Sequence, residues 1–95
     1  MVENHTYRMR IRVNGRVQGV GFRWFILTEA RRRGLKGWVR NNRDGSVELE
    51  AEGSAADIAA LRARAAAGPP AARVASVIDL PVSGAPLSEP FDVGH

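Results

Sequence analysis

Apolar and charged side chains alternate near the start of the chain, which predicts a half-buried strand. Its apolar positions are Tyr7, Met9, Ile11 and Val13, and the three residues between them are arginines. A period of two places one set of side chains on the core and the other set on the opposite face of a sheet. Residues 46–52 alternate in the same way with glutamates as the charged set, and predict another strand.

Two segments have helical spacing instead. One side of the segment 22–33 carries Phe22, Phe25, Ile26, Glu29 and Ala30. The spacing of three and four residues predicts a helix over 22–33, which ends at a glycine. Ser54 with an aspartate three residues later is a capping box, and it predicts the start of a second helix. That helix is expected to end at the Gly-Pro-Pro run of residues 68–70.

The remaining segments predict further strands. Residues 35–41 form an extended run that leads into Asp44-Gly45, a strong hairpin signal. Residues 74–82 are extended with imperfect alternation, which indicates a bulge or an edge position. Residues 83–90 are expected to be a loop, and residues 91–93 a short last strand.

The order of these elements predicts an α+β fold, β-α-β-β-α-β, with a four- to five-stranded antiparallel sheet and two helices on one face. We expect one domain over residues 1–95, with residues 1–6 as a flexible N-terminal segment. The arginines of the first strand and the glutamates of 46–52 are expected to face water together. Trp38 is expected to pack in or beside the core.

Composition excludes several classes of chemistry. The 95-residue chain has no cysteine, which rules out disulfides, thiolate metal sites and a cysteine nucleophile. The two histidines, His5 and His95, lie near the ends, and no metal site is expected. No apolar run approaches the roughly 20 residues of a membrane span, and residues 1–5 lack a signal-peptide pattern. The expectation is a cytoplasmic monomer with no membrane or nucleic-acid partner.

Charge is distributed unevenly along the chain. Residues 1–47 hold 11 basic and 3 acidic side chains, whereas residues 48–95 hold 3 basic and 7 acidic ones. A basic half favours an anionic ligand. Solvated sheet and helix faces account equally well for most of these arginines.

A glycine-rich stretch, residues 15–21 (the glycine loop), joins the first strand to the first helix. Glycines let several backbone N–H groups point into one concavity, and the helix N-terminus adds unpaired N–H groups. Arg23 in the first helical turn can fold back over such a loop and grip phosphate oxygens. A tight crossover turn with a surface arginine fits the loop as well. Neither the P-loop nor the dinucleotide pattern is present, since Trp24 stands where the latter needs glycine.

Asn41 ends the predicted strand 35–41. A helical crossover makes this strand parallel to the first one, so their C-terminal ends lie at the same edge of the sheet. With one strand between them, Asn41 is expected roughly 10 Å from the first strand. A phosphoryl group and one water would fill that gap. Alternatively, Asn41 is a hairpin residue that caps its own backbone.

Two long segments closely resemble the signatures of the acylphosphatase family. They are GRVQGVGFR at residues 15–23 and GWVRNNRDGSV at residues 37–47, and the resemblance extends from Tyr7 to Val93. It implies a ferredoxin-like α/β sandwich that hydrolyses the carboxyl–phosphate bond of small acyl phosphates without a metal or other cofactor. Inorganic phosphate is then the product and an expected inhibitor.

The resemblance also implies site residues. Arg23 would bind the phosphoryl group, and Asn41 would orient the attacking water. Backbone donors would come from Val17, Gln18, Gly19, Val20, Gly21 and Phe22. Trp24 is a further candidate for contact with the acyl group.

Two other functions are compatible with such a fold. One is a non-catalytic module that binds an acyl or carbamoyl phosphate within a larger assembly. The other is an RNA-binding domain, which needs aromatic side chains on the open sheet face for base stacking. The arginines and glutamates predicted for that face argue against RNA binding.

Overall fold

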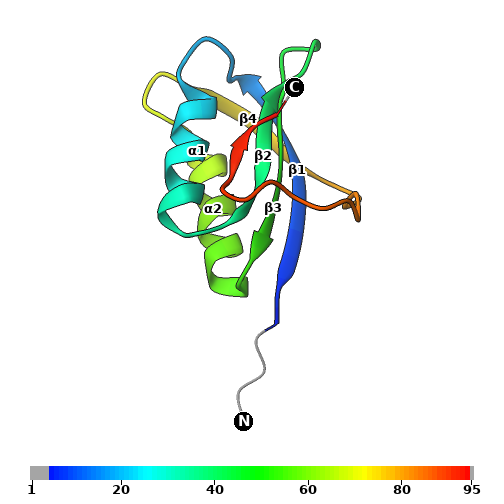
Figure 1. Cartoon of the computed structure of the whole chain (residues 1–95). Helices are drawn as coiled ribbons and strands as arrows, with labels where there is room; N and C mark the ends of the chain where they lie inside the picture. Colours follow the sequence, from blue (N-terminus) through cyan, green and yellow to red (C-terminus); the bar gives the residue numbers. More distant parts are fainter. Residues whose placement is uncertain (1–4, 95) are drawn as a thin grey trace.

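Two helices cover one face of a five-stranded sheet in the computed structural model, which describes residues 5–94 (Figure 1). The elements in chain order are β1 (Tyr7–Arg16), α1 (Phe22–Arg32), β2 (Lys36–Asn41), β3 (Val47–Gly53), α2 (Ala55–Ala67), β4 (Arg73–Leu80) and β5 (Asp92–Val93). This order confirms the predicted α+β fold. His95 and most of the predicted flexible segment 1–6 lie outside the described residues.

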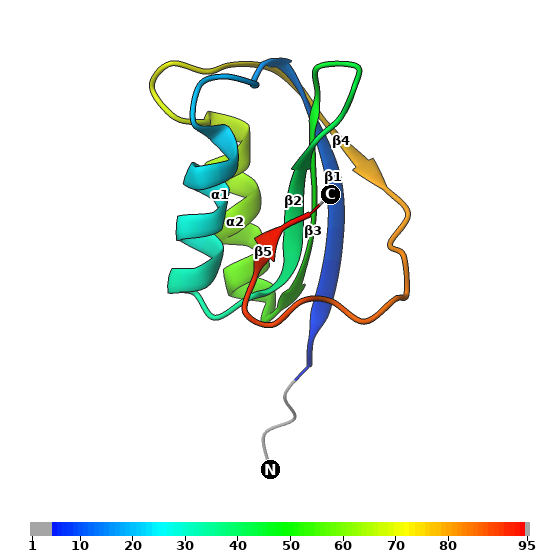
Figure 2. The ribbon, with the colours of Figure 1, turned by 45° about the horizontal axis from the view of Figure 1, so that its top comes forward.

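The strands are ordered β4-β1-β3-β2-β5. β3 pairs antiparallel with both β1 and β2, so β1 and β2 run the same way with β3 between them, as predicted. The prediction of a fully antiparallel sheet is wrong for β5, which pairs parallel with β2. The physical reason is the path of residues 81–91, which carry the chain from the β4 edge to the opposite edge (Figure 2).

The core lies between the helices and the apolar face of the sheet. Its largest fully buried side chains include Phe22 and Ile26 of α1, Leu61 of α2, Leu49 of β3 and Phe91. The capping box predicted for α2 is present, since the Ser54 hydroxyl accepts a hydrogen bond from the Asp57 amide at 3.2 Å. No helix among residues 5–94 has the length and apolarity needed to cross a membrane.

The polar side of the sheet differs from the expected water-facing surface. Glu48 and Glu50 of β3 are buried. Residues 81–91 pass over this side, where the Ser83 amide donates to Glu50 Oε2 at 2.8 Å and the Arg8 guanidinium donates to the Ala85 carbonyl at 2.7 Å. The long connection thus contacts Glu50 and Arg8, two charged residues that alternation alone assigns to solvent.

Trp38 also lies on this polar side, which corrects its predicted place in or beside the core. Two guanidinium groups lie over its ring, with Arg10 5.5 Å and Arg40 4.8 Å from the ring centroid. The alternation of β2 explains the position. Val39 faces the core and is fully buried, so its neighbour Trp38 points to the opposite side.

Candidate active site

A pocket of about 350 Å³ opens where the glycine loop, the start of α1 and the C-terminal ends of β2 and β5 meet. Its walls are formed by Val17, Gly19, Gly21, Phe22, Arg23, Trp24, Leu27, Asn41 and Val93. The pocket therefore brings Arg23 and Asn41 together with four of the six predicted loop residues. Gln18 and Val20 are not part of the wall, and Val20 packs against the core instead.

The glycine loop presents backbone donors that have no acceptor. Gly19 and Gly21 have φ angles of 74° and 78°, a left-handed backbone conformation that residues other than glycine rarely adopt. Gly21 is also the N-cap of α1, and no side chain among the described residues caps the N-terminus of this helix. Within residues 5–94, none of the amides of residues 18–24 donates a hydrogen bond. A run of unpaired amides at a helix N-terminus is a good setting for an anion.

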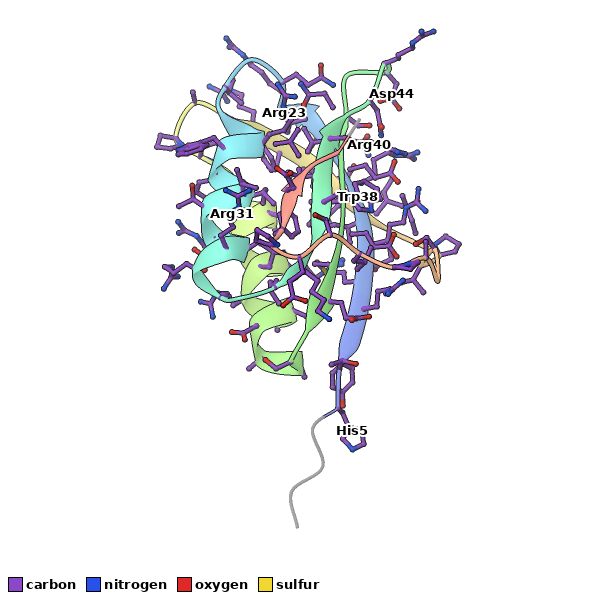
Figure 3. All side chains as sticks on the ribbon, viewed as in Figure 1. His5, Arg23, Arg31, Trp38, Arg40 and Asp44 are labelled. Carbon is purple, nitrogen blue, oxygen red and sulfur yellow. The ribbon has the colours of Figure 1, made fainter. Side chains whose placement is uncertain are left out.

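Arg23 adds a positive charge to this pocket. Its side chain is exposed, and within residues 5–94 it has neither a hydrogen bond nor an ion pair. Many other arginines bind carboxylates; Arg8, for example, bonds Glu52 at 2.9 Å. No aspartate or glutamate of the described part of the chain lines the pocket. The Arg23 guanidinium is thus available to an anionic ligand, at the end of the molecule that also holds the turn with Asp44 (Figure 3).

Asn41 is the last residue of β2 and pairs through its backbone with Val47. Its carboxamide has no hydrogen-bond partner within residues 5–94, so the alternative of an asparagine that caps its own hairpin does not apply. The neighbouring Asn42 fills that structural role. Its Nδ2 donates to Ser46 Oγ and to Glu48 Oε1, both at 3.0 Å.

The Gln18 side chain connects the glycine loop to the β2–β3 hairpin. Its Nε2 donates to the Asn42 carbonyl at 2.7 Å and to the Ser46 carbonyl at 2.9 Å. Residue 42 directly follows Asn41. The two hydrogen bonds therefore fix the position of the loop relative to the free carboxamide. Sequence reasoning assigned Gln18 only a backbone role, and no local pattern could have revealed this link across 24 residues.

Two carboxylates brace the hairpin. The Ser46 hydroxyl and amide donate to Asp44 and lower the pKa of that carboxyl. Burial of Glu48 opposes its ionisation, but hydrogen bonds from Asn42 and Arg10 outweigh it and lower the Glu48 pKa. Both groups thus stay ionised at neutral pH, and the hairpin that carries Asn41 keeps its shape.

Sequence reasoning missed two apolar members of the wall, Leu27 and Val93. Leu27 lies one helical turn after Arg23 on the same side of α1, a spacing that marks a shared face. Val93 comes from β5, whose pairing with β2 could not be foreseen. No cluster of three or more potential metal ligands occurs within residues 5–94. His5 lies at the opposite end of the molecule from Arg23 (Figure 3).

Comparison with known proteins identifies the family of this chain. A family model described as Acylphosphatase matches residues 9–86. The chain belongs to the acylphosphatase family. It is 54% identical over 77 residues to an acylphosphatase from Bifidobacterium longum, covering 79% of each chain. It is 52% identical over 89 residues to one from an Anaeromyxobacter species, covering 93% of this chain and 95% of that one.

Solved structures of the acylphosphatase family have the same fold. The structure of an acylphosphatase from Coxiella burnetii has a TM-score of 0.83 at 33% identity, over 99% of this chain and all of that one. The acylphosphatase from Bacillus subtilis has a TM-score of 0.81 at 35% identity, over 96% of this chain. Full-length HypF is also similar, with a TM-score of 0.80 at 29% identity, but this chain covers only 12% of it.

Proposed function

We propose that this member of the acylphosphatase family hydrolyses small acyl phosphates to a carboxylate and inorganic phosphate in the pocket between the glycine loop and Asn41. One observation carries the proposal. One pocket is lined by residues of a loop with unpaired amides, by an arginine that has no carboxylate partner within residues 5–94, and by Asn41, whose carboxamide has no hydrogen-bond partner there. Protein groups that have no protein partner are available to a ligand.

In this proposal the phosphoryl group occupies the glycine loop. Amides of Val17 to Phe22 donate to its oxygens, and Arg23 binds them in a charge-assisted, bidentate manner. Phosphoryl transfer depends mainly on positioning and on charge stabilisation, and an acyl phosphate already carries a good leaving group. A guanidinium with several backbone donors supplies both needs, so the reaction needs no metal or other cofactor.

In this proposal Asn41 positions the attacking water. Its carbonyl oxygen accepts a hydrogen bond from the water and holds it opposite the leaving carboxylate. A bond forms between the water oxygen and phosphorus as the bond from phosphorus to the acyl oxygen breaks. An amide cannot take up a proton at neutral pH. The water proton therefore passes to the phosphoryl oxygens, and inorganic phosphate leaves.

A direct assay tests the function. The wild-type chain should hydrolyse benzoyl phosphate, which is followed by the loss of its ultraviolet absorbance. Removal of one preorganised donor to a transition-state oxyanion typically costs about 2.7–4 kcal/mol. Arg23→Gln should therefore lower turnover at least about 100-fold, with the melting temperature unchanged. Arg43→Gln is the matched control, since Arg43 is an exposed arginine of the β2–β3 turn outside the pocket wall. An Arg23 variant with half its turnover would refute the assigned role.

The two other functions predict different results. A non-catalytic module would bind acyl phosphates without turnover. An RNA-binding domain would bind RNA tightly and with strong salt dependence. The family assignment favours neither. On the polar side of the sheet, moreover, the single aromatic side chain of β1–β3 is Trp38, whose ring already contacts the Arg10 and Arg40 guanidinium groups.

Several finer expectations accompany the proposal. Inorganic phosphate should inhibit competitively, since product and substrate share the phosphoryl site. Residues 1–95 are proposed to act as one domain and as a monomer in the cytoplasm. Analytical ultracentrifugation tests the oligomeric state, and cell fractionation tests the location.

A further inference from the structure

Trp24 is the most exposed large apolar side chain in the described part of the chain, with 71% of its surface accessible. It lies at the pocket wall directly after Arg23 in α1. Within residues 5–94 its ring has no aromatic or cationic partner. The core does not require an indole at this position, because the side chain contributes little burial. A large aromatic ring left open to solvent beside a pocket is well suited to contact a ligand.

The pocket wall has two chemically different parts. The polar part consists of the glycine loop, Arg23 and Asn41, and the apolar part includes Trp24, Leu27 and Val93. Trp24 and Leu27 are three residues apart on α1, so they share one face of the helix. Val93 extends the apolar part from β5. An acyl phosphate has the same two parts, a phosphoryl group and an acyl group.

The apolar part of the wall has no charged side chain that could pair with a charged acyl group. Among the described residues, 5–94, Arg23 is the only charged one in the wall, and it belongs to the phosphoryl end. A volume of about 350 Å³ is in the range of small-molecule sites, about 300–1,000 Å³, and leaves room beyond a phosphoryl group. A flat, uncharged acyl group would cover the exposed indole face and the partly buried Val93 side chain at once, beside the already buried Leu27.

We propose that Trp24 is a specificity-determining residue that binds the acyl group, and that the chain prefers acyl phosphates with an aromatic or other bulky apolar acyl group. This inference rests on the proposed function, because it assumes that the phosphoryl group occupies the glycine loop. The indole contacts the acyl group in the ground state as well as in the transition state. Its loss should therefore appear mainly in KM rather than in kcat.

The test compares kcat/KM for benzoyl phosphate and acetyl phosphate in four full-length chains: wild type, Trp24→Ala, Trp24→Phe and Tyr7→Ala. Tyr7 is the matched control, a 50%-exposed aromatic at the end of β1 far from the glycine loop. Trp24→Ala should lower kcat/KM for benzoyl phosphate about 5- to 10-fold, as expected for the loss of an aromatic pair, and that for acetyl phosphate less than about twofold. Trp24→Phe should keep most of the preference, and Tyr7→Ala all of it.

Each outcome separates this inference from the proposed function. If the wild-type chain hydrolyses neither substrate, the proposed function fails. If it hydrolyses both and Trp24→Ala lowers both to the same extent, or neither, Trp24 does not bind the acyl group and the inference is overturned. Melting temperatures of the four chains identify any loss that comes from unfolding, which is not expected for a side chain this exposed.

Discussion

Replacing Gln18 with leucine tests how the glycine loop and Asn41 are held in position. Leucine keeps the approximate bulk but removes both hydrogen bonds to the hairpin carbonyls of Asn42 and Ser46. Each such bond contributes about 0.5–1.5 kcal/mol net. Each carbonyl keeps one other hydrogen bond. The Asn42 carbonyl still accepts from the Gly45 N–H, and the Ser46 carbonyl still accepts from the Asn42 N–H. The expected loss is therefore in the lower part of the summed range, about 1–2 kcal/mol.

This loss has two measurable consequences. A domain of this size loses about 4–8 °C of melting temperature per kcal/mol, so Gln18→Leu should melt roughly 5–15 °C lower. Turnover of benzoyl phosphate should fall about 10- to 100-fold at a temperature where the variant is fully folded, because a misplacement of about 1 Å can cost that much. Circular dichroism and steady-state kinetics measure the two effects.

A matched control isolates the positioning effect. Asn14→Leu removes a side-chain hydrogen bond of similar kind, from Asn14 Nδ2 to Ser76 Oγ, which joins β1 to β4 outside the pocket wall. This variant should lose some stability but keep at least half of its turnover. If Gln18→Leu is destabilised yet turns over at the wild-type rate while folded, the Gln18 side chain does not position the site.

Further predictions concern stability, acid sensitivity and ligands. Gly37→Ala should destabilise the chain by more than about 2 kcal/mol in chemical unfolding, because a Cβ at its φ of 144° would collide with the Glu50 carbonyl and the Phe91 ring; a smaller loss would show that the sheet edge can adjust. The folded-state pKa values of Glu29, Asp44 and Glu48 are lowered, so their stabilisation is fully present above the ordinary pKa values of 4.5 for the glutamates and 3.8 for the aspartate. It is lost as the pH falls from these ordinary values through the lowered ones. Melting temperature should accordingly drop below about pH 4.5, less steeply in Glu48→Gln, and equal slopes would exclude Glu48 as a contributor. Incubation with a chelator followed by desalting should leave turnover unchanged, and a loss restored by Mg²⁺ would contradict the metal-free proposal. Inorganic phosphate at about 100 times its Kd should stabilise the wild type by about 2.7 kcal/mol and Arg23→Gln much less; equal shifts would place the anion elsewhere.

Local patterns in the sequence predict most of the fold. The alternation around Ile11 and Leu49, the Asp44-Gly45 turn and the Ser54 cap each depend on residues close together in the chain. Such features follow from backbone geometry and neighbouring side chains, so a single sequence contains enough information for them.

Features that depend on distant segments could not be predicted. The buried Glu50 accepts a hydrogen bond from the Ser83 amide, 33 residues away, and no alternation of polar residues signals this contact. The parallel pairing of β5 depends on the path of residues 81–91 across the sheet. The same reason hides Val93 from a sequence-based list of pocket residues. The motifs identified Arg23 and Asn41 as candidates, but their freedom from protein partners is a property of the folded chain.

The central claim is that loop amides and Arg23 bind the phosphoryl group while Asn41 places only the water. Its most direct test measures, in Asn41→Ala, the kcat for benzoyl phosphate and the inhibition constant of inorganic phosphate against the residual turnover. The account predicts that kcat falls at least about 100-fold while the inhibition constant stays within about threefold of the wild-type value, because the phosphate contacts are intact. A weakening of phosphate binding as large as the loss of kcat would contradict it and assign Asn41 to phosphate binding instead.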